Sequence, residues 1–342
     1  MAKGAKIQNV YSLTPMQQGM LFNYLYNRDS KAYFQQLSFS IEADLDIDVF
    51  EISVNTVISR YDIFRSIFIY EKVEEPKQVV LAERSTKIFY EDISHMDSQS
   101  RNYYLDEFKE KDREKGFDLS KDLLMRIAII KVGTNDYEIV WSHHHIIMDG
   151  WCLGLVISDF IKIYKSLRYG EEHKQDTAYQ YVDYINWLVK QDNNKANGYW
   201  KEYLADYENE IELPRKTKIK VQDYDKKEIH FTINKEMTLK IVNMCRKANV
   251  TVNNAFQAIW SIVLQRYNNM DDVVFGAVVS GRNAPIEGIE KIVGLFINTI
   301  PIRVNCDGNL TFSDLLMNIR DDYNQSTRYD FVSLAQIQNT CN

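Results

Sequence analysis

Three consecutive histidines, His143 to His145, lie within the stretch 137–155, which reads YEIVWSHHHIIMDGWCLGL. The first half of this stretch alternates and is rich in β-branched and aromatic residues, which predicts a buried strand. Successive side chains on a strand point to opposite faces, so His143 and His145 share one face and His144 takes the other. The chain therefore presents an imidazole, His145, at the end of a predicted strand.

The second half of the stretch predicts an amphipathic helix that begins directly after a turn at residues 146–149. Its apolar positions recur at helical spacing at Leu153, Ile157, Phe160, Tyr164 and Leu167. The first turn of a helix holds unpaired N–H donors and partial positive charge, which suits a developing oxyanion. An imidazole beside such a turn is, in outline, an acyl-transfer site.

Two other interpretations of these residues concern a metal ion and a helix cap. His143 and His145 share a face, but no third Cys or His ligand stands at a recognisable spacing, so no metal is expected. Asp149 precedes Gly150 at the predicted helix start, and the local sequence alone favours a capping role for its carboxylate.

His144, His145, Asp149 and Gly150 form the pattern HHxxxDG, which resembles the core motif of nonribosomal peptide synthetase condensation domains and their chloramphenicol-acetyltransferase-like relatives. Five further stretches resemble the family's other motifs in the same order, and the match is close to the N-terminal condensation domains of tyrocidine-type and gramicidin-type synthetases. These stretches are Ser12 to Phe22 (SLTPMQQGMLF), Arg60 to Phe68 (RYDIFRSIF), Tyr181 to Trp187 (YVDYINW), Val293 to Arg303 (VGLFINTIPIR) and Arg328 to Leu334 (RYDFVSL).

The resemblance implies that the α-amine of an acceptor aminoacyl thioester attacks the thioester carbonyl of a donor chain. Both substrates hang on phosphopantetheine arms of carrier domains, and no cofactor is permanently bound. Positioning can supply roughly 7–11 kcal/mol, against roughly 3–5 kcal/mol for acid–base help. His145 is therefore expected to orient the attacking amine and to accept its proton, with His144 as a supporting residue.

The resemblance also assigns roles around the core motif. Asp149 is expected in a buried ion pair with an arginine, for which Arg65 and Arg282 are both candidates, and the backbone of Gly150 is expected close to the reacting groups. Asn298 either lines the substrate channel or only finishes a strand. Cys152 packs in the first helical turn, or, in a different enzyme, acts as a nucleophile.

The expected fold is α+β, with two chloramphenicol-acetyltransferase-like lobes in a V shape. The family continues beyond its sixth motif, so a chain ending at Asn342 is expected to have an incomplete second lobe. The predicted organisation is a docking segment over residues 1–12, an N-terminal lobe over 13–170 and a partial C-terminal lobe over 171–342.

Local patterns predict several individual elements. Asp46 and Thr251 are expected to cap helices, Thr311 with Asp314 to form a capping box, and Glu228 to Ile233 to form a strand. The charged turn YEKVEEPK is expected to join two strands of a hairpin.

Composition limits the partners and the compartment. The net charge of -7 gives no basic field for a nucleic acid, and four widely spaced cysteines fit a reduced, cytoplasmic setting. No apolar run has the length of a signal peptide core or a membrane span, so no membrane contact is expected.

The finer predictions concern substrate and partners. The first motif and the sequence DGWC resemble the subtype that joins a D-configured donor to an L-configured acceptor. The donor carrier is expected to come in trans from an epimerization-containing synthetase, and the acceptor carrier to lie downstream. The alternatives are a truncated, non-catalytic docking module for carrier proteins and an epimerization-type relative, although the latter's first motif reads closer to PIQxWF than to PMQQGMLF.

Overall fold

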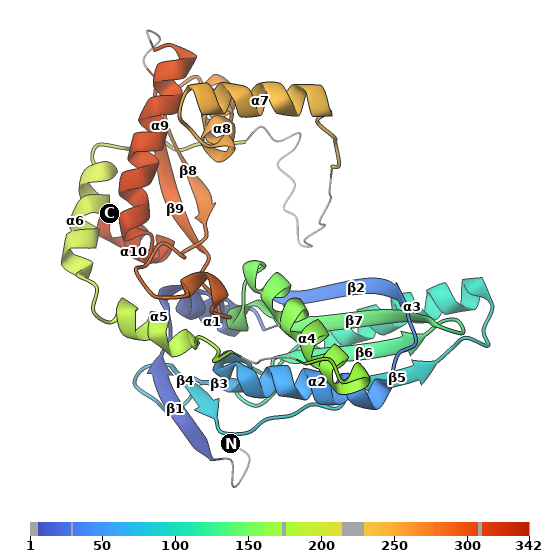
Figure 1. Ribbon diagram of the computed structural model, residues 1–342. Coiled ribbons are helices and arrows are strands. Elements are labelled where there is room, and N and C mark those ends of the chain that lie inside the picture. Colours follow the sequence, from blue (N-terminus) through green and yellow to red (C-terminus); the bar gives the residue numbers. More distant parts are fainter. Residues whose placement is uncertain (1–5, 29, 173–175, 214–228, 307–309, 342) are drawn as a thin grey trace. The chain divides into compact units, whose positions relative to one another are not determined.

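The computed structural model describes residues 6–28, 30–172, 176–213, 229–306 and 310–341 (Figure 1). The chain divides into two compact units, of which the first holds Met1–Gln191 and Ser280–Ile297 and the second holds Asp192–Val279 and Asn298–Asn342. This division differs from the predicted boundary between residues 170 and 171. Helix α5 (Tyr181–Leu188) buries Tyr181 and Tyr184 in the core of the first unit, and the later segment 280–297 also packs there.

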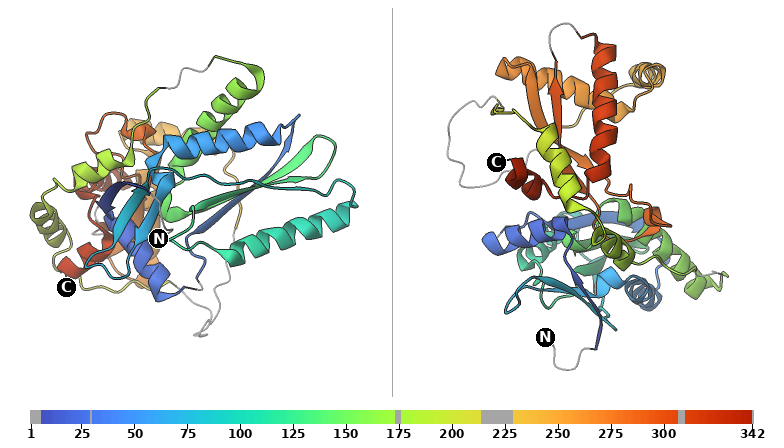
Figure 2. Two further views of the ribbon diagram at one scale, coloured as in Figure 1. Left: turned by 90° about the horizontal axis from the view of Figure 1, so that it is seen from below. Right: turned by 90° about the vertical axis from the view of Figure 1, so that its left-hand side faces the viewer.

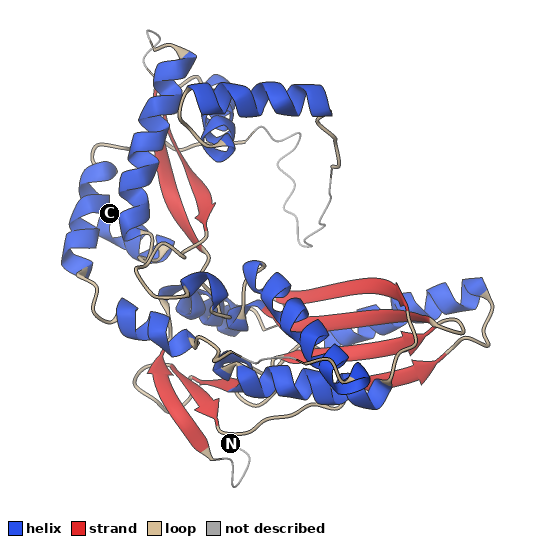
Figure 3. Cartoon of the chain, in the orientation of Figure 1, coloured by secondary structure: helices blue, strands red, loops and turns tan. Residues whose placement is uncertain are grey.

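The first unit contains a four-stranded sheet in the order β2-β7-β6-β5 (Figure 3). Strand β7 is central and pairs antiparallel with β2 and β6, while β5 runs parallel to β6. Helices α2 and α4 pack on one face of this sheet, and α3 packs on the other, where Asp112 bonds Ser142 of β7. The bounds are β2 (Phe34–Glu42), β5 (Phe89–Asp92), β6 (Met125–Lys131), β7 (Asp136–His144), α2 (Ile47–Arg60), α3 (Ser98–Lys115) and α4 (Trp151–Tyr169).

A second, antiparallel sheet of the first unit has the order β1-β4-β3. It consists of β1 (Ile7–Ser12), β4 (Lys77–Leu81) and β3 (Ser66–Ile69), and β3 follows a short 3-10 helix, η1 (Asp62–Arg65). The hairpin predicted around YEKVEEPK is confirmed as β3 and β4. Residues 7–12 of the predicted docking segment are a strand of this sheet, and residues 1–5 lie outside the described part of the chain.

Helix α1 (Pro15–Tyr26) follows β1 directly and begins with a capping box. Thr14 accepts a hydrogen bond from the backbone N–H of Gln17, while the side chain of Gln17 accepts one from the backbone N–H of Thr14. Such a reciprocal pair satisfies two backbone donors that the helix cannot satisfy itself. The start of α1 is therefore fixed by local sequence.

The second unit is built on an antiparallel ribbon of β8 (Asp272–Val279) and β9 (Asn298–Asn305), against which α8 and α9 pack (Figure 2). Thr251 and Thr311 both form capping boxes, with Asn254 and Asp314 respectively. The helices are α6 (Asn193–Tyr203), α7 (Lys235–Lys247), α8 (Val252–Asn268), α9 (Phe312–Ser326) and α10 (Leu334–Cys341).

One predicted element of the second unit is wrong. Residues 229–233, the described part of the predicted strand, are not in a strand, and Ile229 and Phe231 are 90% and 80% exposed. Apolar alternation predicts a strand only where one face can be buried against neighbours. These two side chains have no such cover in the described structure.

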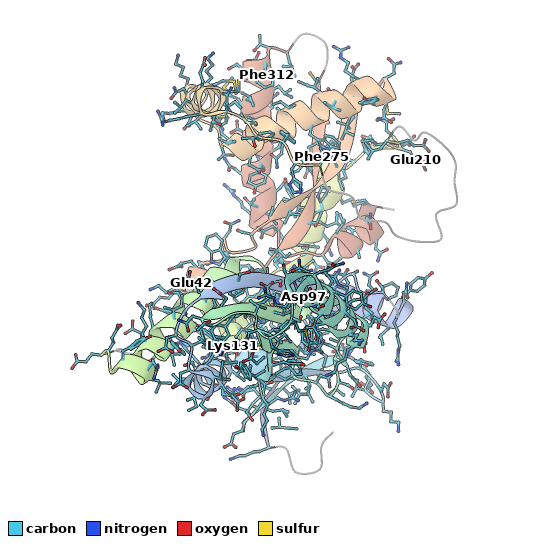
Figure 4. The ribbon with its side chains drawn as sticks, turned by 90° about the vertical axis from the view of Figure 1, so that its right-hand side faces the viewer. Glu42, Asp97, Lys131, Glu210, Phe275 and Phe312 are labelled. Atoms are coloured by element: carbon cyan, nitrogen blue, oxygen red, sulfur yellow. The ribbon has the colours of Figure 1, made fainter. Side chains whose placement is uncertain are left out.

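Side chains on both units can be followed in Figure 4, where Glu42 and Lys131 mark the ends of β2 and β6, Asp97 the cap of α3, and Phe312 the start of α9. The core of the first unit joins the sheet, its helices and the segment after Ile289. Its fully buried members include Ile58, Ile129, Ile146, Tyr181 and Ile292. Within the described residues, no helix is both long and apolar enough to span a membrane.

Candidate active site

The HHxxxDG residues form a tight turn between β7 and α4. Strand β7 ends at His144, a 3-10 turn, η2 (His145–Ile147), follows at once, and α4 begins at Trp151. The backbone N–H of His144 donates to Leu124 O at 3.0 Å, and that of His145 donates to Tyr33 O at 2.8 Å. The predicted placement of His145 at a strand end, just ahead of a helix, is confirmed.

The side chain of His145 is only partly buried, whereas Ile146, Ile147 and Met148 of the same turn are fully buried. Its Nδ1 atom is enclosed and has no hydrogen-bond partner among the described residues. The direction of this ring is therefore set by the backbone of the turn, not by a bond to the ring.

His143 and His144 lie on opposite faces of β7. The ring of His143 lies 5.7 Å from that of Trp141, while the ring of His144 lies 6.4 Å from Tyr24 and 6.1 Å from Tyr33. Burial, and then repulsion from His145, lowers the pKa of each to about 3. Neutral His144 can then accept the backbone N–H of Ile146 at Nδ1, at 3.1 Å, so its ring supports the turn. Within the described ranges, no cluster of three or more potential ligands could hold a metal ion.

The carboxylate of Asp149 is completely enclosed, and both of its oxygens are engaged. Oδ2 accepts the backbone N–H groups of Phe296 at 2.9 Å and Ile297 at 3.3 Å, while Oδ1 lies 3.5 Å from Arg282 Nη2. The N-cap of α4 is Gly150, and no side chain caps that helix. The capping interpretation of Asp149 is wrong, because its carboxylate turns toward the segment 296–297 instead.

Of the two arginine candidates, Arg282 is the partner of Asp149. Its Nη1 also donates to Ile289 O at 2.7 Å and Ile292 O at 2.9 Å, and its guanidinium lies 4.0 Å from the ring centre of Phe296. Arg65 is not the partner. It donates to Leu81 O at 2.6 Å, Ala82 O at 3.0 Å and Gln8 Oε1 at 2.6 Å, so it joins β1 to the end of β4.

Cys152 completes this buried cluster as a packing residue. Its Sγ lies 3.2 Å from Gly294 O, 3.3 Å from Asp149 Oδ1 and 3.3 Å from Arg282 Nη2. Burial, and then the neighbouring Asp149, raises the pKa of the thiol to about 12. A fully buried thiol with a raised pKa is a poor nucleophile, which favours the packing interpretation of Cys152.

The segment that holds Asp149 is itself held by Tyr181. This fully buried residue donates its hydroxyl to Leu295 O, and its ring occupies the space that a Cβ at position 294 would need. Gly294 is therefore required by close approach, and its carbonyl accepts the backbone N–H of Asp149 at 3.3 Å. The HHxxxDG motif and the stretches Tyr181 to Trp187 and Val293 to Arg303 thus meet in one cluster.

Gly150 and Asn298, two further predicted site residues, do not belong to this buried cluster. Gly150 is exposed, has ordinary helical backbone angles, and would meet nothing with an added Cβ, so neither its backbone nor its packing requires glycine. Asn298 lies in the second unit, where its side-chain amide donates to Asp330 O at 2.6 Å and Val332 O at 2.7 Å. Because both amide hydrogens are used, the geometry favours the interpretation that Asn298 finishes a strand.

Sequence reasoning missed the backbone donors at 296–297 and the role of Tyr33. Both act through main-chain atoms, which any residue type supplies, so no residue pattern could point to them. Tyr181 and Gly294 were within motifs but had no assigned contact. The signal available was the pairing of a large aromatic in one motif with a glycine in another.

The fold thus places a partly exposed histidine on a turn that a buried aspartate holds in position. The chain matches the family model of the condensation domain over residues 7–342. It belongs to that family, whose members form amide bonds in nonribosomal peptide synthesis. The resemblance and the α+β fold class are thereby confirmed.

The curated relatives are large synthetases. The chain is 44% identical to one of the plipastatin synthase subunits from Bacillus subtilis (strain 168) over 338 residues, covering 99% of this chain and 13% of that protein. It is 40% identical to gramicidin S synthase 2 of Brevibacillus brevis over 338 residues, covering 98% of this chain and 8% of that protein. The chain thus spans only a small share of these relatives' length.

Solved structures agree on the fold. A mutant of the starter condensation domain of rhizomide synthetase superposes with a TM-score of 0.79 at 17% identity, covering 98% of this chain and 75% of that one. A four-domain nonribosomal peptide synthetase bound to AMP and glycine gives 0.78 at 18% identity, covering 100% of this chain and 26% of that one.

Proposed function

We propose that this chain joins the α-amine of an acceptor aminoacyl thioester to the carbonyl of a donor peptidyl or aminoacyl thioester. The amine nitrogen forms the new amide bond, the carbon–sulfur bond of the donor breaks, and the amine proton is passed on as the thiol leaves. Both substrates arrive on phosphopantetheine arms of carrier domains, so the arm is part of the substrate. Family membership supports this reaction class.

The observation that carries the proposal is the contrast between His145 and its neighbours on the turn. His145 is the partly exposed ionisable side chain there, while Asp149 is 1% exposed and bonded to other groups. Within the described structure, no hydrogen bond joins the Asp149 carboxylate to the His145 ring, so the pair is not arranged like the Asp–His pair of a hydrolase triad.

This arrangement suits aminolysis of a thioester. An α-amine has a pKa near 8 and a thioester is already activated. The reaction therefore does not need a strong base; it needs a well-oriented group that can accept one proton. His145 holds the amine and receives that proton as the tetrahedral intermediate forms. Arg282 and Asp149 hold the turn in place, and His144 supports it from the other face of β7.

The finer part of the proposal is that the donor residue is D-configured, the acceptor L-configured, and the donor carrier a separate protein. Support comes from the first motif and DGWC, and from similarity to synthetases such as gramicidin S synthase 2. Because β1 begins at Ile7, a deletion that tests the docking segment must stop before that residue. Deleting residues 1–5 is expected to weaken condensation only with a donor carrier supplied in trans.

The test is a condensation assay with purified carriers, each loaded with a donor or an acceptor, with product measured by mass spectrometry. Donors ending in the D or the L form of the same residue are compared in the absence of epimerase. Dipeptide formation that is lost in His145→Ala supports the reaction and its residue. Intact carrier binding without product would instead support the docking module, and preference for the L donor would overturn only the stereochemical part.

A further inference from the structure

Gln17 is a fully buried amide on α1 that reaches the active-site turn. Its Oε1 accepts the N–H of Thr14 at 3.0 Å, and its Nε2 donates to Gln78 Oε1 at 2.8 Å and to Ile146 O at 3.3 Å. An amide buried without partners costs roughly 1–3 kcal/mol, so a buried glutamine normally persists only when it is satisfied. Here its two amide hydrogens and its carbonyl oxygen are all used.

The bond to Ile146 O replaces one that the turn itself does not make. The next hydrogen bond of a 3-10 turn after Met148 N to His145 O would join Asp149 N to Ile146 O. Asp149 N instead donates to Gly294 O, so the carbonyl of Ile146 is left for Gln17. Since His144 Nδ1 accepts the N–H of the same residue, Ile146 is held at both of its backbone polar groups.

The anchor of Gln17 lies in the small sheet of the first unit. Gln78 on β4 donates from Nε2 to Ser66 Oγ at 3.1 Å, and Ser66 on β3 donates to Asp62 O at 3.3 Å. Gln17, Gln78 and Ser66 are all 0% exposed. A satisfied buried network of this kind makes one arrangement of its members strongly preferred.

We propose that Gln17 is a positioning residue for the reaction, fixing the peptide between Ile146 and Ile147, next to His145, and thereby the direction of the imidazole. This inference rests on the proposed function of His145. The ring has no bond at Nδ1 within the described residues, so its aim depends on the backbone that carries it. A misplacement of about 1 Å can cost 10²-fold in rate, which makes the backbone anchor matter.

The chain offers matched variants for the test. Gln17→Met keeps the length of the side chain and removes all three bonds. Gln18→Met makes the same change at the exposed neighbour, and Gln78→Met removes an equally buried amide while leaving the contact from Gln17 to Ile146 O. If Gln17→Met does not fold, Gln17→Glu replaces it in every comparison, because it keeps the acceptor for Thr14.

Condensation is measured well below each variant's thermal midpoint, with kcat and the KM for the acceptor carrier determined separately. Gln17→Met is expected to lower kcat by about 10- to 100-fold with little change in KM. Gln18→Met is expected to retain full kcat, and Gln78→Met, which removes the anchor of Gln17 but leaves its contact with Ile146 O, to lose less kcat than Gln17→Met. Full kcat in Gln17→Met would overturn the inference.

The second arm places Gln17→Met in the His145→Ala background. If Gln17 acts through His145, the double variant has the residual rate of His145→Ala alone, since interacting residues are not additive. A further 10-fold loss in that background would show a general structural effect and overturn the inference. Full activity of His145→Ala itself would instead refute the proposed function, so the two failures are distinguishable.

Discussion

The two ends of the active-site turn are held in opposite ways. At one end, the Asp149 carboxylate is enclosed by Arg282 and two backbone N–H groups, and at the other the His145 ring is partly exposed with Nδ1 unbonded within the described residues. A buried, fully bonded carboxylate fixes geometry, whereas a group that must exchange a proton with substrate needs access. The difference supports the proposal that Asp149 is structural and that His145 takes part in the chemistry.

Asp149→Ala tests the structural end and should have the largest effect on stability. It leaves Arg282 and two amide donors buried without their partner, which costs about 3–5 kcal/mol of unfolding free energy. Urea unfolding of Asp46→Ala is the control, because Asp46 is a half-buried N-cap of α2, also paired with Arg168 at 3.4 Å, whose loss costs about 0.5–2 kcal/mol. Equal losses in the two variants would remove the distinction between a buried anchor and a cap.

His145→Ala tests the chemical end. If His145 orients and deprotonates the amine as proposed, its loss should lower turnover by about 10²- to 10⁴-fold. Its unfolding free energy should stay close to that of the unsubstituted chain, because the ring is partly exposed and its Nδ1 forms no bond to the described residues. A large drop in the thermal midpoint would place His145 with Asp149 as a structural residue.

The pH dependence of stability tests whether His143 and His144 belong to the structural side. Their folded-state pKa values are lowered to about 3, so between about pH 6.5 and pH 3 the unfolded chain binds protons that the folded chain excludes. Stability should therefore fall as pH falls below about 6.5, by about 1.4 kcal/mol per pH unit for each histidine. The free energy of unfolding, measured with urea between pH 7.5 and 5.5, should depend less steeply on pH in His143→Gln and in His144→Asn than in the unsubstituted chain. An unchanged slope in both would mean that neither ring is held neutral.

Tyr181→Phe makes the smallest change, removing the hydroxyl of α5 that donates to Leu295 O in the segment that holds Asp149. The expected cost is about 1 kcal/mol, with a modest loss of turnover because Leu295 precedes the two donors to the carboxylate. Tyr199→Phe in the second unit removes a comparable bond, to Ser326, and should cost similar stability with unchanged turnover. Equal turnover in both variants would show that the segment tolerates small shifts.

The elements that depend mainly on nearby residues could be predicted from the sequence. Alternation located β7, helical spacing located α4, and the capping residues Asp46, Thr251 and Thr311 are confirmed. The motif stretches contain Asp149, Tyr181 and Gly294 of the buried cluster, and Arg282 was one of the two predicted partners of Asp149.

What the sequence left open depends on contacts between distant residues. Local sequence favoured Asp149 as a cap, and only the arrival of residues 296–297, nearly half the chain later, turns the carboxylate away from α4. Arg65 and Arg282 could not be separated because either arginine could reach a buried acid. The strand predicted at Glu228 to Ile233 failed for the related reason that alternation does not reveal whether a partner exists.

The segment 280–297 belongs to the first unit although β8 and β9 of the second unit flank it in sequence. During synthesis, Asp149 therefore leaves the ribosome 147 residues before Phe296, the donor to its carboxylate. At about 5–20 residues per second this is a delay of roughly 7–30 s. For that time the Asp149 carboxylate lacks its backbone donors, so the turn that carries His145 is not yet held in place. Closing so long a loop also adds to the folding barrier. A nascent chain halted before residue 280 should thus carry His145 on a turn that lacks its final geometry.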